Sequence, residues 1–130
     1  MTRDELKKRI DAVEEGYEYF LAYAAQGLSG AADGASETQI REFLQRTDQA
    51  LTGLAAGLNT LVEREELKPA EPFQSMIGAL ERDARTSQAA IQLVLAQPAI
   101  SSQLIDNLNA SIHLRALLTD LFLFDEILKG

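Results

Sequence analysis

The chain has one histidine, His113, and it is the first residue to consider for chemistry, because an imidazole can transfer protons or bind a metal near neutral pH. Asp106 and Asp120 lie seven residues before and after it. On one helix these three side chains share a face, but seven residues rise about 10 Å along the axis. They cannot form one site within a single helix. His113 is therefore either a hydrogen-bonded residue at a helix seam or an isolated proton-handling or metal-binding group at an interface.

A carboxylate-bridged di-metal centre is the enzyme site that helical bundles commonly build, from Glu residues and Glu-x-x-His motifs. The residue three before His113 is Ala110, so the motif is absent. Glu14 and Glu18 lie one turn apart, and an all-oxygen site around them would suit Ca²⁺ or Mg²⁺. Acidic residues beside an apolar row more often form a solvated edge. The sequence therefore predicts no metal site and no cofactor.

Composition excludes further classes of function. The chain has no cysteine, which rules out disulfides, thiolate metal ligands and a cysteine nucleophile, and fits a reducing compartment. Twenty acidic residues against 12 basic ones give a net charge of −8, which repels phosphate backbones and anionic lipid. The glycine-containing stretch 29–35 has no lysine and follows no strand, so it is no phosphate loop. These features argue against nucleic-acid binding and against an enzyme.

Hydropathy argues against a membrane protein. The longest strongly apolar run is 121–124, far short of the ~20 residues that cross a bilayer. The first ten residues are charged and continue into a helical pattern, so they do not resemble a signal peptide. The sequence predicts a cytoplasmic location.

Apolar residues recur at alternating gaps of 4 and 3, which is the spacing of one helical face. The first row is Leu6, Ile10, Val13, Tyr17, Phe20 and Ala24. The second is Ile40, Leu44, Thr47, Leu51, Leu54, Leu58 and Leu61, and the third is Phe73, Ile77, Leu80, Ala84, Ser87, Ile91 and Val94. We expect helices over about 3–27, 37–67, 72–97 and 102–128, with a flexible loop at 29–35. Thr2 and Glu5 match a capping box at the first helix. Pro69 and Pro98 end the second and third helices. The prediction is one all-α domain over 1–130, an up-down-up-down antiparallel four-helix bundle.

The predicted C-terminal helix is unusually apolar, because it carries two apolar stripes. Placed at 100° per residue, the stripes are centred roughly 140° apart. The first contains Ile105, Leu108, Ile112, Ala116, Leu123 and Ile127. The second contains Ala110, Leu114, Leu117, Leu121, Phe124 and Leu128, and Leu118 and Phe122 begin a third. A bundle helix usually needs one stripe, so the second is either buried between neighbouring helices or free to bind a partner.

We expect the second stripe to form an interface, since large apolar patches on proteins commonly mark contact sites. The favoured function is a non-enzymatic interaction or assembly protein that forms a homo-oligomer, a dimer above all, or docks another helical protein. The expected interface residues are Leu114, Leu117, Leu121, Phe122, Phe124 and Leu128, extended by Tyr19 and Tyr23.

The alternative function is a small-molecule or metal-binding bundle. Gly53 and Gly57 lie one turn apart inside a predicted helix, where each costs stability of about 1 kcal/mol relative to Ala. Such a pair lets another helix, a bulky side chain or a ligand approach closely. In the ligand hypothesis the pocket is lined by Gly53, Gly57, Tyr17 and His113.

Overall fold

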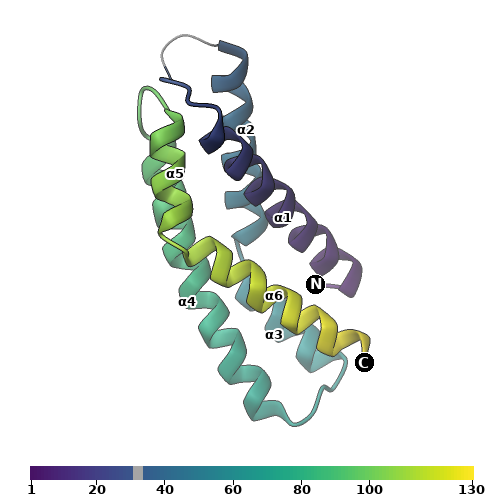
Figure 1. The fold of residues 1–130 in the computed structure, drawn as a ribbon. Coiled ribbons are helices and arrows are strands. Elements are labelled where there is room, and N and C mark those ends of the chain that lie inside the picture. The colour runs from purple at the N-terminus through teal and green to yellow at the C-terminus, as the bar shows by residue number, and fades with distance from the viewer. Residues whose placement is uncertain (31–33) are drawn as a thin grey trace.

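The chain folds into helices and short connections in the computed structural model, which describes residues 1–30 and 34–130. The helices are α1 (Arg3–Ala25), α2 (Gly34–Leu51), α3 (Leu54–Arg64), α4 (Ala70–Leu95), α5 (Ser102–Ala110) and α6 (His113–Lys129) (Figure 1). The described residues contain no strand, so the all-α prediction is confirmed. None of their helices is long and apolar enough to cross a membrane. The loop expected at 29–35 falls partly on 31–33, which lie outside the described residues, and α2 already begins at Gly34.

Two of the four expected helices are each divided in two. The helix expected at 37–67 breaks at Thr52 and Gly53, where Gly53 adopts a left-handed φ of 69°. Arg9 stabilises this break by donating to the backbone carbonyls of Ala50 and Thr52, which lie at the end of α2. The helix expected at 102–128 breaks at Ser111 and Ile112, although that range contains no Gly or Pro. The structure therefore has six helices over its described residues, where the sequence predicted four.

The helices pack around one core of buried apolar side chains, and Figure 1 shows their arrangement. α1 packs against α2, α5 and α6, and α4 packs against α2, α3, α5 and α6. The two ends of the chain lie at the same end of the molecule (Figure 1). There Arg3 donates to the backbone carbonyl of Leu128 and forms an ion pair with Glu65, at the C-terminus of α3. The first helix begins with the predicted capping box of Thr2 and Glu5.

The apolar rows predicted from the sequence form most of the core. Along α2 and α3 the predicted row is buried at every position: Ile40, Leu44, Thr47, Leu51, Leu54, Leu58 and Leu61. The 4 and 3 spacing continues through the break, since Leu51 before it and Leu54 after it are both buried. In α1 the row shifts slightly: Tyr17 is only partly buried, whereas Gly16 and Tyr23 are buried.

Gly16 allows α1 and α2 to approach closely. A Cβ added at Gly16 would lie 2.2 Å from Oγ1 of Thr47, which is itself buried and donates to the carbonyl of Phe43. We expect Gly16→Ala to lower the free energy of unfolding by about 1–3 kcal/mol, because overpacking outweighs the gain in helix propensity. Urea unfolding measures it.

Gly78 in α4 provides the matched control. A Cβ there would meet only the end of the Arg82 side chain, at 3.8 Å. Gly78→Ala should therefore stabilise the protein by about 0.5–1 kcal/mol. Adding Thr47→Ala to Gly16→Ala should recover part of the loss. Equal effects of the two glycine substitutions would contradict the close approach of α1 and α2.

Candidate functional site

The stripe that we expected to form an interface lies inside the molecule. Its α6 members are almost fully buried, with exposed fractions of 7% or less: Leu114, Leu117, Leu121, Phe124 and Leu128. They face the helices that α6 contacts, α4 and α1. These residues are core within a single chain, which corrects the expectation that they present a free surface.

The break between α5 and α6 explains this correction. In α5 the first stripe points inward, and Ile105 and Leu108 are buried. In α6 the second stripe points inward instead, while Leu123 and Ile127 of the first stripe are each 53% exposed. The turn at Ser111 and Ile112 therefore exchanges the two stripes, so each half of the segment buries a different face.

The remaining expected interface residues have different surroundings. Phe122 is 42% exposed on α6. Tyr23 is buried and its hydroxyl donates to the backbone carbonyl of Ile100. Tyr19 is partly buried, stacks on the Phe43 ring with centroids 4.1 Å apart, and donates to Gln39. The two tyrosines connect α1 to α2 and to the segment before α5.

An apolar groove of about 320 Å³ lies between α6 and the beginning of α4. Its lining consists of Lys68, Pro69, Pro72, Phe73, Met76, Leu123, Phe124 and Ile127. Phe73 meets the Phe124 ring edge-on, with centroids 5.8 Å apart, and this pair forms part of the groove wall. Leu123 and Ile127 are the half-exposed α6 residues of the first stripe. The groove has exposed aliphatic side chains, aromatic walls and a single charged residue, Lys68, as is typical of an apolar binding surface.

Sequence reasoning missed this groove, although a signal for it was present. Leu123 and Ile127 are spaced by four, which places both on one face of α6. Pro69 indicates only a helix end from the sequence. The contact between the beginning of α4 and the end of α6 brings these residues together, and that contact depends on the tertiary fold.

The four residues expected to line a ligand pocket do not share one. Gly53 lines a hollow of about 210 Å³ between α3 and α4, with Glu81, Arg85 and Gln88 at its side. Gly57 instead faces the Met1 side chain, whose sulfur would lie 3.1 Å from an added Cβ. Close packing therefore accounts for Gly57, and the left-handed turn accounts for Gly53.

His113 and Tyr17 also lie outside that hollow. His113 is exposed at the first position of α6, and Tyr17 packs at the edge of the core. Within 1–30 and 34–130, no three His, Asp or Glu side chains gather closely enough to hold a metal ion. In particular, His113, Asp106 and Asp120 do not form such a cluster.

Two carboxylates approach each other where α4 meets α6. Burial raises the pKa of the Asp120 carboxyl, and the nearby charge of Asp83 raises this pKa further. A raised pKa in the folded state means that ionised Asp120 weakens folding. This cost is fully present above the raised pKa, is lost as the pH falls through it, and is gone below the pKa that Asp120 has in the unfolded chain.

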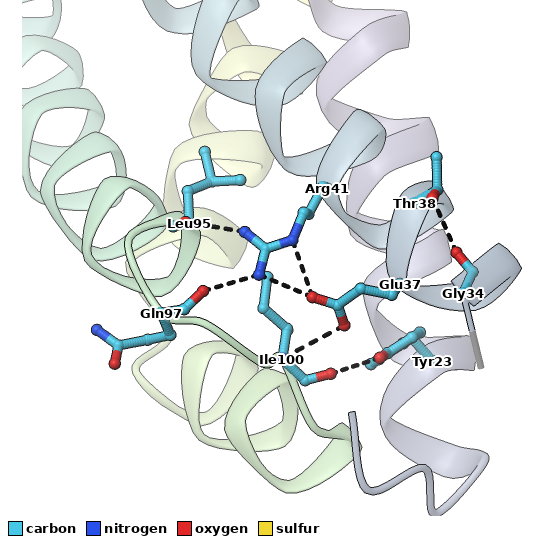
Figure 2. Close-up of polar contacts among 8 residues, drawn as sticks. All are labelled: Tyr23, Gly34, Glu37, Thr38, Arg41, Leu95, Gln97 and Ile100. Carbon is cyan, nitrogen blue, oxygen red and sulfur yellow. Dashed lines mark hydrogen bonds and ion pairs between the residues drawn. The ribbon is translucent and has the colours of Figure 1, made fainter. Parts of the chain in front are cut away.

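A polar network fixes the turn between α4 and α5 (Figure 2). The Arg41 guanidinium donates to the backbone carbonyls of Leu95 and Gln97, at 2.9 and 2.7 Å, and forms an ion pair with Glu37 at 2.7 Å. Glu37 in turn accepts from the backbone N–H of Ile100. Because these contacts satisfy backbone groups where α4 ends, the network is structural. From the sequence only the spacing of four between Glu37 and Arg41 was visible.

Comparison of the chain with protein-family models, with curated proteins and with solved structures finds no match. The described residues form an all-α fold with an apolar surface groove beside the C-terminal helix α6.

Proposed function

We propose that this chain is a non-enzymatic interaction or assembly protein that self-associates through α6, within a bundle that runs up-down-up-down. The observation that carries the proposal is the groove between α6 and the beginning of α4, beside the half-exposed Leu123 and Ile127. Burying a fully exposed apolar side chain of this size contributes about 1.5–3 kcal/mol, and Leu123 and Ile127, already half buried, would gain about half of that each. A helix laid in the groove would bury them. The absence of cysteine supports placing the protein in the cytoplasm.

A second copy of the chain is the occupant that the charges beside the groove favour. A two-fold contact pairs the same surface of each copy, so each groove can receive Ile127 of the other. Glu126 precedes Ile127 in the chain, and its side chain is 77% exposed in a surface ion pair with Lys129, while Lys68 lies at the groove. Seating Ile127 in the opposite groove brings Glu126 toward Lys68 of the other copy. The apolar contact then has an ion pair at its edge.

We expect Leu123→Asp with Ile127→Asp to abolish self-association while the fold is kept. Both side chains are half exposed, so the cost to folding is small, whereas two carboxylates on an apolar contact oppose burial. Light scattering over a range of concentrations should give a dimer for the wild type and a monomer for the variant. Circular dichroism should show equal helix content.

Leu93→Asp is the control for this experiment. Leu93 is 67% exposed at the far end of α4, and its substitution should leave the dimer intact. A dimer that forms in the Leu123 and Ile127 variant with the same concentration dependence as in the wild type would refute the groove as the contact. A wild type that stays monomeric at every concentration would refute self-association, and the groove would then be tested against other helical proteins.

The alternative function, a ligand-binding bundle, has weaker support. The hollow beside Gly53 is below the size of about 300–1,000 Å³ that is usual for small-molecule sites. Gly57 packs against Met1 instead of lining it. The assembly proposal is therefore the one that the described surface favours.

A further inference from the structure

The turn between α5 and α6 is held in a conformation that its residues disfavour. Ile112 has a φ of 59°, in the left-handed region, where a β-branched side chain crowds the backbone. Its side chain is 60% exposed, so the turn gains little burial from it. Neither glycine nor asparagine occupies the position. Nothing in the local sequence requires the chain to turn here.

A second cost lies three residues earlier. Both amide atoms of Asn109 are buried, and neither has a hydrogen-bond partner in the described part of the chain. Buried amides are normally paired, because leaving them unpaired loses their hydration without compensation. The closed turn therefore combines a strained backbone with an unsatisfied side chain.

The apolar pattern shows what a straight helix would do instead. In a continuous helix over 102–129 the two stripes would lie about 140° apart. Ile105 and Leu108 could keep their places in the core of their own chain. Leu117, Leu121 and Phe124 would then point away from it, toward another molecule.

We propose that the turn at Ser111 and Ile112 can straighten, and that two copies of the chain then exchange α6. In the exchanged dimer, α6 of each copy packs on α4 and α1 of the other. The occupant follows from the structure, because the buried face of α6 and the face that receives it are already complementary within one chain. Straightening relieves the strain at Ile112, and the buried contacts are the same in both states. This exchange is independent of the groove contact proposed above.

Substitution of Ile112 tests the exchange. Ile112→Gly favours the closed turn, since glycine adopts a positive φ without a steric cost and weakens a helix. Ile112→Ala favours the straight helix. Both are made in the Leu123→Asp, Ile127→Asp background, so the groove cannot contribute. Each protein is refolded from urea at high concentration, and the dimer fraction is measured by chromatography with light scattering.

We expect Ile112→Ala to raise the ratio of dimer to monomer at least tenfold over Ile112→Gly. Because an exchanged dimer must undock α6 to separate, it should persist after dilution and dissociate faster in low urea. Equal dimer fractions in the two Ile112 variants, or no dimer with Ile112→Ala, would overturn the exchange. The groove proposal would be unaffected, because its residues are already removed.

Discussion

Leu121→Asp combined with Phe124→Asp is expected to unfold the protein. The two side chains are 1% and 2% exposed, and the Phe124 ring packs edge-on against Phe73. Removing each large apolar side chain from a core costs about 2–5 kcal/mol. Burying an unpaired carboxylate in its place adds to that cost. The sum reaches the total stability of a domain, about 5–15 kcal/mol. Circular dichroism should show the loss of most helix content at neutral pH.

The adjacent residues Phe122 and Leu123 provide a control with the same side chains. They are 42% and 53% exposed, so Phe122→Asp with Leu123→Asp should keep the helix content and nearly the same melting temperature. A folded monomer in both double variants would contradict the burial of the second stripe. That result would instead support the interface between molecules that we expected for Leu121 and Phe124 from the sequence.

Arg41→Ala is expected to give the second-largest loss of stability, about 2–3 kcal/mol in the free energy of unfolding. Its guanidinium holds the carbonyls of Leu95 and Gln97, and the substitution also leaves Glu37 without its ion pair. Hydrogen bonds to a charged group contribute about 1.5–3 kcal/mol each, and their sum is reduced here because the Arg41 side chain is 28% exposed. Urea unfolding and a thermal melt measure the effect.

Two control variants separate the network from the charge of Arg41. Arg41→Lys keeps the charge but cannot hold two carbonyls and a carboxylate with one planar group, so it should recover only part of the loss. Arg46 is exposed, with its guanidinium 4.7 Å from the centre of the Phe43 ring, and Arg46→Ala should cost less than about 1 kcal/mol. Equal losses for the Arg41 and Arg46 alanine variants would show that the turn after α4 does not depend on the network.

Local sequence determined the helical class, most helix ends and most of the core. Gaps of 4 and 3 identify an inward face without knowledge of the fold, because helix geometry fixes which residues share a face. The predicted buried row holds at every position in α2 and α3, and in α4 from Ile77 to Val94. The capping box at Thr2 is equally local, since it joins residues within one turn.

The tertiary structure alone decided which stripe of the C-terminal segment is buried. Both stripes satisfy the helical spacing, and the choice depends on how α6 meets α4 and α1 after the turn at Ile112. The groove and the Arg41 network have the same origin, because each joins residues more than 45 positions apart in the chain. Spacing along a helix describes its own faces. It holds no information about which neighbour covers a face, because that is set by the packing free energy of the whole molecule.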